Sequence, residues 1–402
     1  MISLLNLDRA GFRVLPLPSG IGDNSGSDGT CFPCAAYRPA PELDGNLQID
    51  PEIHLPSPGM DVDISYFYNA SDSYNGPFGY GRTLSHNLRA QASGSPTVVT
   101  LTHGNGDLAT YQYDAVSGNY LCGTPGVFNT LVKDVPNSLW KETTPNGYVT
   151  AYPLDTVGNV TTATYIQDPV GNTHTLAYSS GLLSSIQDAV GRFVTLSYSS
   201  GLLQSIQDWA QRRTTFAYDA VTFPALPVLT TVTGPTGCNT QYQYSAPNGL
   251  PLVMGIVDPN GYGTSYTYDQ QNRVVNRTVA SIGVTTYLYQ PGAMIAVNAL
   301  GVVTTQNSDA NFNLTGTVDP GTGGVNTFTY NANRQETSRQ NAQGAFTTTT
   351  YDASGNATKL QDALGYITTY QVDAFNNTTT VTYADGGVTA KIYGYGGSPF
   401  DT

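Results

Sequence analysis

The chain has 402 residues, of which only 11% are charged, and its formal net charge is −13. This acidic balance argues against nucleic acid as a partner, because nucleic-acid-binding domains present clustered Lys and Arg. No apolar run approaches the roughly 18 residues that a membrane helix needs. Gly (43), Pro (24) and Tyr (28) are abundant, and β-branched and aromatic residues recur throughout, which favours strands joined by turns. We therefore predict an all-β fold.

The first predicted segment, residues 1–44, is rich in Pro and Gly. Its start lacks the basic leader and the long apolar stretch of a signal peptide. Cys31 and Cys34 have the spacing of a redox motif, but no βαβ pattern surrounds them. A local disulfide or plain structural thiols, a clip that pins the N-terminal segment, a metal site and a redox role all remain open. Four cysteines in all are too few for a disulfide-built scaffold of this length.

From residue 144 onward the sequence repeats. A turn of the form Asp-x-x-Gly is followed by Tyr, and in the clearest copies the Asp recurs every 20 residues. We predict that the repeat is anchored by Asp168, Gly171, Tyr178, Asp188, Gly191, Tyr198, Asp208, Tyr218, Asp258, Gly261, Tyr268, Gly344, Tyr351, Asp362, Gly365 and Tyr370.

Each repeat unit is expected to be a β-hairpin. In the turn, the Asp side chain accepts backbone hydrogen bonds from residues further along, and Gly adopts a positive φ without steric strain. The run that follows, for example residues 193–198, alternates apolar or aromatic residues with Thr or Ser, which is the period of a strand with one buried face. A second turn and a short strand complete the unit. Successive hairpins should pair into one long antiparallel array.

The frame Asp-x-x-Gly-x-x-Thr-x-Tyr-x-Tyr-Asp-x-x-Gly-Asn resembles the YD repeat of Rhs proteins, insecticidal Tc toxins and animal teneurins, and residues 144–383 follow it almost continuously. The preceding region resembles the N-terminal module of many bacterial Rhs shells at Pro56–Gly59, Ile64–Asn69, Gly76–Gly81, Leu84–Asn87 and His103–Asp107. The resemblance implies a β module at 45–143 and a YD-repeat β array at 144–402.

In that family the repeats imply a β-sheet that curls into a spiral, tube or shell segment, which often surrounds a C-terminal toxin. The resemblance also implies a bacterial protein at the cell surface or outside the cell. Two departures are visible. The array is not followed by an Asp-Pro-x-Gly-Leu autocleavage motif, and no toxin domain follows it. The chain would then be the encapsulating part of a polymorphic toxin without its toxin domain.

Size limits what such an array can enclose. About 30 strands at roughly 4.8 Å spacing give a ribbon of about 145 Å, which is about one turn of a shell around a small domain. Since one turn cannot enclose a cargo, we expect either the remainder of a longer Rhs shell or self-association through the open ribbon ends.

Motifs for catalysis are missing from the sequence. The four histidines, His54, His86, His103 and His174, form no His-x-x-x-His pair, and no Gly-x-Ser-x-Gly motif occurs. Asp61 and Asp63 do not match a calcium loop, and the repeated Asp residues each occupy a turn position. We predict no enzyme activity, catalytic residue, cofactor or metal.

The repeated tyrosines leave two functions open. If they are buried, they anchor the repeats and the protein is a structural scaffold. If they are exposed beside Asn and Asp, they could stack on sugar rings, and the protein would be a carbohydrate-binding or adhesion module. We take the scaffold as the first hypothesis.

Overall fold

The computed structural model describes residues 40–49, 51–94, 98–154, 158–374, 376–393 and 399–401. Their regular secondary structure consists of strands, which confirms the predicted all-β class. None of these residues belongs to a helix that could cross a membrane. Cys31 and Cys34 lie outside the described residues.

The chain divides into two compact units. Unit 1 comprises Met1–Pro56, Asp61–Asn87 and Ala177–Leu314, and unit 2 comprises Ser57–Met60, Leu88–Leu176 and Thr315–Thr402. Two strands, β16 (Thr173–Ser179) and β29 (Leu314–Val318), contribute residues to both units.

Unit 1 contains a small N-terminal module and a run of repeat strands. The module consists of β1 (Gln48–Ile49), β2 (Glu52–Leu55), β3 (Val62–Asn69), β4 (Asn75–Gly76), β5 (Gly79–Tyr80) and β6 (Arg82–Leu84). The repeat strands are β17 (Leu182–Gln187), β18 (Phe193–Ser199), β19 (Leu202–Gln207), β20 (Arg213–Asp219), β21 (Val228–Thr233), β22 (Asn239–Ser245), β23 (Leu252–Val257), β24 (Gly263–Tyr268), β25 (Val274–Val279), β26 (Gly283–Gln290), β27 (Ala293–Val297) and β28 (Val303–Ser308).

Unit 2 contains two runs of strands. The first is β7 (Arg89–Ser93), β8 (Val98–Thr102), β9 (Leu108–Asp114), β10 (Asn119–Cys122), β11 (Thr130–Asp134), β12 (Leu139–Thr143), β13 (Val149–Pro153), β14 (Val160–Thr162) and β15 (Tyr165–Gln167). The second is β30 (Val325–Tyr330), β31 (Glu336–Gln340), β32 (Phe346–Tyr351), β33 (Ala357–Gln361), β34 (Ile367–Val372), β35 (Thr378–Thr382), β36 (Val388–Tyr393) and β37 (Pro399–Asp401).

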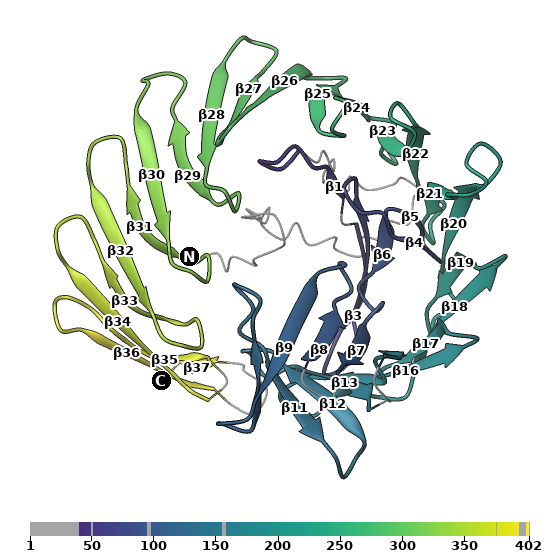
Figure 1. Ribbon diagram of the computed structural model, residues 1–402, viewed down its shortest axis with the longest axis horizontal. Helices are drawn as coiled ribbons and strands as arrows, with labels where there is room; N and C mark the ends of the chain where they lie inside the picture. The colour runs from purple at the N-terminus through teal and green to yellow at the C-terminus, as the bar shows by residue number, and fades with distance from the viewer. Residues whose placement is uncertain are drawn as a thin grey trace. The chain divides into compact units, whose positions relative to one another are not determined.

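Strands β7 to β36 form one long antiparallel sheet, in which nearly every strand pairs with its neighbours in sequence (Figure 1). This is the predicted array of consecutive hairpins. Alternation places apolar residues on one face of many of these strands, as in β18, where Val194 and Leu196 are buried and Phe193 is exposed. The predicted curling into a spiral, tube or shell stays a prediction.

In unit 1 the module lies against the apolar face of the repeat strands. Alternate residues of β3, including Ile64 and Tyr68, are buried. The backbone of the module is also bonded to the repeats, since Leu203 N donates to Pro77 O (2.8 Å) and Tyr80 N donates to Pro227 O (2.8 Å). The repeat strands that the module contacts are therefore covered on one face by a second layer, whereas no residue of β28 is buried.

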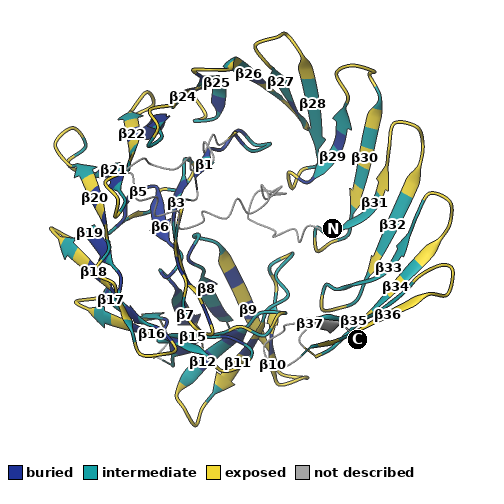
Figure 2. Ribbon diagram, turned by 180° about the vertical axis from the view of Figure 1, so that it is seen from behind, coloured by how far each residue is buried: buried dark blue, intermediate teal, exposed yellow. Residues whose placement is uncertain are grey.

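In unit 2 the first run of strands folds back on itself, because β7 pairs with both β8 and β14. The side chains of Leu101, Tyr111 and Trp140 fill the space it encloses. The second run differs, because no described residue of β30 to β36 is buried on either face (Figure 2). These strands form a single layer.

The repeat strands share a local irregularity. In seven hairpins the pairing register shifts by one residue at the end of the first strand, which is a β-bulge, whereas β26 pairs with β27 without a shift. The shifts fall at Ser197/Tyr198, Ala217/Tyr218, Gln243/Tyr244, Thr267/Tyr268, Thr329/Tyr330, Thr350/Tyr351 and Gln371/Val372.

Candidate functional site

The repeated Asp residues hold the backbone of their own turns. Asp188 Oδ1 accepts hydrogen bonds from the backbone N of Val190 (3.1 Å) and of Arg192 (2.7 Å), and Asp188 Oδ2 accepts from Arg192 Nε (2.6 Å). The same two backbone bonds are made by Asp168, Asp208, Asp258 and Asp362. Because these carboxylates accept bonds from adjacent peptide groups, their acceptor oxygens are committed to the turn.

The fourth position of each turn needs a left-handed backbone. Gly171 has a φ angle of 95°. The φ angles of Gly191, Gly261, Gly344 and Gly365 are also positive. Gln211 (φ 63°) adopts the left-handed conformation in the turn that begins at Asp208. A side chain is strained there, because the left-handed conformation brings Cβ close to the following carbonyl oxygen.

Four tyrosine hydroxyls of the repeat strands bond backwards along the chain, and three of these tyrosines, Tyr198, Tyr268 and Tyr351, lie at bulges. The hydroxyl of Tyr268 donates to the carbonyl of Val253 (2.7 Å), fifteen residues earlier. The same step of fifteen joins Tyr198 to Leu183 (2.9 Å), Tyr289 to Val274 (2.5 Å) and Tyr351 to Glu336 (2.8 Å).

Three of the four acceptors, Val253, Val274 and Glu336, lie at the preceding bulge. Val253 pairs with Tyr244, and Val274 pairs with Tyr268. A bulge disrupts the ladder of backbone hydrogen bonds, and the hydroxyls of Tyr268, Tyr289 and Tyr351 bond carbonyls at such points. The hydroxyls therefore serve the sheet itself.

Burial affects the ionisation of these side chains. Burial raises the pKa of Tyr198, Tyr218, Tyr268 and Tyr289 well above the ordinary value of 10. The phenols thus remain neutral donors throughout the neutral and mildly alkaline range.

The module is fixed to the repeats around one buried cation, Arg82, whose side chain is only 1% exposed. Its Nε and Nη2 donate to Tyr244 Oη at 3.2 and 3.1 Å, and its guanidinium lies 4.3 Å from the ring centre of Tyr242 and 5.2 Å from that of Tyr68. Nη1 makes no hydrogen bond. The charge is therefore stabilised by aromatic faces and a phenolic oxygen.

Unit 2 contains a buried carboxylate, Glu142. It accepts hydrogen bonds from Tyr111 Oη (2.6 Å) and Asn129 Nδ2 (2.9 Å), and His103 Nε2 lies 3.0 Å from it. Burial alone would raise the pKa of Glu142, but the bonds from His103, Asn129 and Tyr111 hold it below its ordinary value. Glu142 thus remains charged inside the protein.

The groups around Glu142 are not activated for nucleophilic chemistry. Burial, together with the charge of Glu142, raises the pKa of Tyr111, and burial raises the pKa of the Cys122 thiol. A nucleophilic cysteine needs a lowered pKa, because the thiolate is the reactive form. The arrangement therefore suits a structural carboxylate better than a catalytic one.

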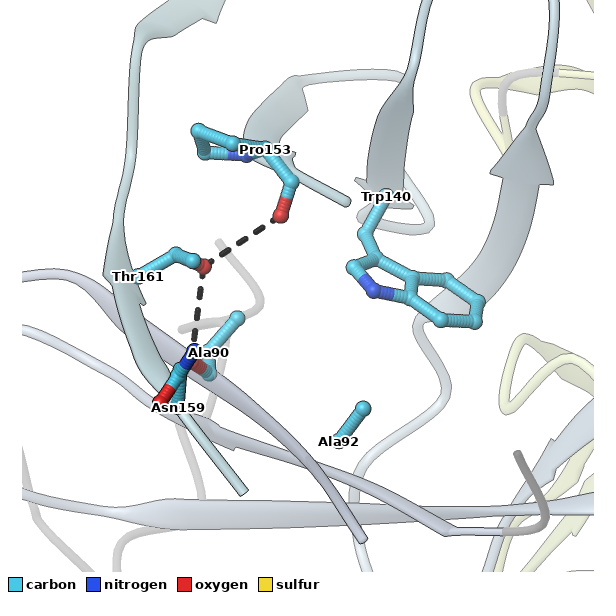
Figure 3. A pocket seen from close by; sticks show the side chains of 6 residues that line it. All are labelled: Ala90, Ala92, Trp140, Pro153, Asn159 and Thr161. Carbon is cyan, nitrogen blue, oxygen red and sulfur yellow. Dashed lines mark hydrogen bonds between the residues drawn. The ribbon is translucent and has the colours of Figure 1, made fainter. Parts of the chain in front are cut away.

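A small pocket in unit 2 lies beside Trp140 (Figure 3). It is lined by Ala90, Ala92, Trp140, Pro153, Asn159 and Thr161. The hydroxyl of Thr161 lies 3.4 Å from the carbonyl oxygens of both Ala90 and Pro153. The space between these side chains does not admit a water molecule.

Comparison with known proteins identifies the repeat. Residues 351–388, which include the turns at Asp352, Asp362 and Asp373, match the family model described as RHS Repeat. This segment is thus similar to the RHS repeat. No curated protein matches its sequence.

Several solved structures are similar to this chain. The crystal structure of TcdB2-TccC3 is 13% identical over 91% of this chain and 22% of the matched chain, with a TM-score of 0.39. The crystal structure of TcdB2-TccC3-TEV is 10% identical over 92% of this chain and 23% of the matched chain, with a TM-score of 0.38. The structure of a Tc holotoxin pore of Photorhabdus luminescens is 11% identical over 88% of this chain and 23% of the matched chain, with a TM-score of 0.28. The chain spans less than a quarter of the length of these matched chains.

The remaining predicted anchors of the repeat lie at different positions relative to the bulges. Tyr218 lies at a bulge like Tyr198, whereas Tyr370 lies two residues before one and Val372 occupies the bulge itself. Tyr178 is part of β16. Among the cysteines of the described residues, Cys122 is a free thiol and Cys238 is disulfide-bonded.

Sequence reasoning missed Arg82 and Glu142. Both depend on contacts between distant segments, such as the 162 residues that separate Arg82 from Tyr244. A charged residue at an inward-facing strand position was the available signal, because such a residue needs buried partners.

Proposed function

We propose that this RHS-repeat chain is a non-enzymatic structural scaffold that forms part of the wall of a shell. The observation that carries the proposal is that the repeated polar side chains form hydrogen bonds with the backbone of the array itself. The Asp side chains bond their own turns, and the tyrosine hydroxyls bond the preceding repeat. Groups committed in this way are not available to turn over a substrate.

The single layer of β30 to β36 supports a role as a wall. A sheet in a stable protein normally buries one face against another layer. Here inward-facing residues of the repeat, such as Phe328, Tyr330 and Tyr351, are all partly exposed. This face would be covered in the complete assembly, either by the remainder of a longer shell or by another copy of the chain. On the resemblance to Rhs shells, we also propose that the assembly lies outside a bacterial cell or at its surface.

The first experiment is to measure the assembly state of the purified chain by light scattering and negative-stain electron microscopy. Regular tubes or filaments that form as the concentration rises would support self-association through the sheet edges. A monomer at every concentration would contradict self-association. Co-expression with flanking RHS repeats should then yield one stable shell, and failure to do so would overturn the wall proposal.

A second candidate function is binding of glycans. Tyr262 and Tyr366 directly follow the turn glycines Gly261 and Gly365, and they are 53% and 60% exposed. Each lies beside the Asp of its turn, as expected of an aromatic platform for sugar rings. Binding on a glycan array that is lost in Tyr262→Ala and Tyr366→Ala would favour this function. Binding that both variants retain would exclude these two tyrosines.

A further inference from the structure

The solvent-facing side of the β2–β3 hairpin brings together a histidine and carboxylates that are separate in sequence. In the hairpin register His54 lies directly opposite Asp63, and Glu52 precedes His54 by two residues. Because side chains alternate between the faces of a strand, all three lie on the same face. The opposite face carries Leu55 and Ile64, among other core residues.

The potential ligand atoms of these residues already converge. His54 Nδ1 lies 2.5 Å from Asp63 Oδ1, and one ligand atom from each of Glu52, His54 and Asp63 lies within 4.8 Å of the others. His54 Nε2 is 4.0 Å from Asp61 Oδ2. Ligands of a tetrahedral metal ion lie about 2.0–2.2 Å from it and hence about 3.5 Å apart. Since the side chains are exposed, small rotations bring them to that spacing.

The charge of the cluster calls for a cation. Glu52, Asp61 and Asp63 place three carboxylates around one imidazole in a chain with only 11% charged residues. Like charges on adjacent positions of a strand pair repel one another. A divalent ion would relieve this repulsion and would replace the contact between His54 and Asp63 with two bonds to the metal.

We propose that Glu52, His54 and Asp63, with Asp61 beside them, form a binding site for a divalent transition-metal ion of the Zn²⁺ class. The imidazole nitrogen selects this class, because Ca²⁺ and Mg²⁺ prefer ligand sets made of oxygen alone. The buried face of the hairpin holds the backbone of β2 and β3 in place, so that the ligands are largely preorganised. The ion would link the two strands across the ladder.

The test is a titration of the chelator-treated full chain with ZnCl₂ by isothermal calorimetry, in parallel with CaCl₂. We compare the natural chain with His54→Ala and Asp63→Asn. The control variant is Asp114→Asn, which removes a partly exposed turn carboxylate from another part of the chain. Circular dichroism checks that each variant is folded, which is expected because the three ligand side chains are exposed.

We expect one Zn²⁺ site that is weakened by about tenfold or more in His54→Ala and in Asp63→Asn and is unchanged in Asp114→Asn. Co²⁺ should give a visible absorption spectrum that changes in His54→Ala. Zn²⁺ binding of unchanged strength in His54→Ala would overturn the proposal. So would the absence of Zn²⁺ binding, or Ca²⁺ binding as tight as Zn²⁺ binding.

Discussion

The peptide groups of Val253 are held by two tyrosines from different parts of the chain. Val253 N donates to the hydroxyl of Tyr68 in the module (3.1 Å), and its carbonyl accepts from Tyr268 in the next repeat (2.7 Å). Val253 pairs with Tyr244 at a bulge, where the regular ladder is interrupted. One residue thus joins the module, a repeat strand and the following repeat.

The hydroxyl of Tyr268 can be tested by Tyr268→Phe. The ring is kept, but the carbonyl of Val253 loses its donor in a buried position. We expect the free energy of unfolding to fall by about 1–3 kcal/mol. Tyr262→Phe is the control, because Tyr262 is 53% exposed, and it should change stability by less than about 0.5 kcal/mol. Equal effects in urea unfolding would show that the hydroxyl of Tyr268 is not structural.

The turn glycines can be tested by a pair of Gly→Ala variants. Neither Gly171 nor Gly263 has an atom within 4 Å of an added Cβ, but only Gly171 has a positive φ (95°). Gly171→Ala should destabilise the protein by about 1–2 kcal/mol through backbone strain alone. Gly263→Ala should be neutral or slightly stabilising. Thermal unfolding of both variants measures the difference, and similar losses at the two sites would exclude backbone strain as the cause.

The buried guanidinium of Arg82 can be tested by two substitutions. Arg82→Lys keeps a charge but loses the paired hydrogen bonds to Tyr244, and we expect a loss of about 2–4 kcal/mol. Arg82→Met removes the charge and keeps much of the volume. Its loss should be smaller, because an apolar side chain needs no partner in this position. A lower free energy of unfolding in urea for Arg82→Met than for Arg82→Lys would contradict this prediction.

The carboxylate of Glu142 should contribute to the acid sensitivity of unit 2. Its pKa is lowered from 4.5, so the unfolded chain takes up this proton before the folded one does. The stabilisation is complete above pH 4.5 and is lost as the pH falls through the folded pKa. Glu142→Gln should therefore be less stable than the natural chain at pH 7, and the gap should narrow below pH 4.5. A gap that is constant between pH 7 and pH 3 in thermal unfolding would refute this.

The fold class and the hairpin order could be predicted because they depend on local signals. The Asp-x-x-Gly turn and the alternation of residues 193–198 are each contained in a few residues, and the repeat multiplies them. The bulge at Tyr198 could not be predicted, because alternation alone does not show where one strand carries an extra residue.

The candidate sites were harder to predict, because they depend on pairing between segments. Glu52 and His54 show their common face in the sequence, but Asp63 joins them only through the register of β2 with β3. The network of Glu142 likewise needs His103, which lies 39 residues earlier. Such contacts become visible only when the strands have been placed side by side.

The hydroxyl bonds of Tyr198, Tyr268, Tyr289 and Tyr351 in the repeats all point in one direction, from a donor to an acceptor fifteen residues nearer the N-terminus. A ribosome produces the acceptor first. When each new tyrosine emerges, the carbonyl that it needs already belongs to a completed strand, so no repeat has to wait for a later one before it can close. The array is thus suited to folding one hairpin at a time during synthesis. Each of the four tyrosine hydroxyls bonds its new hairpin to the preceding one.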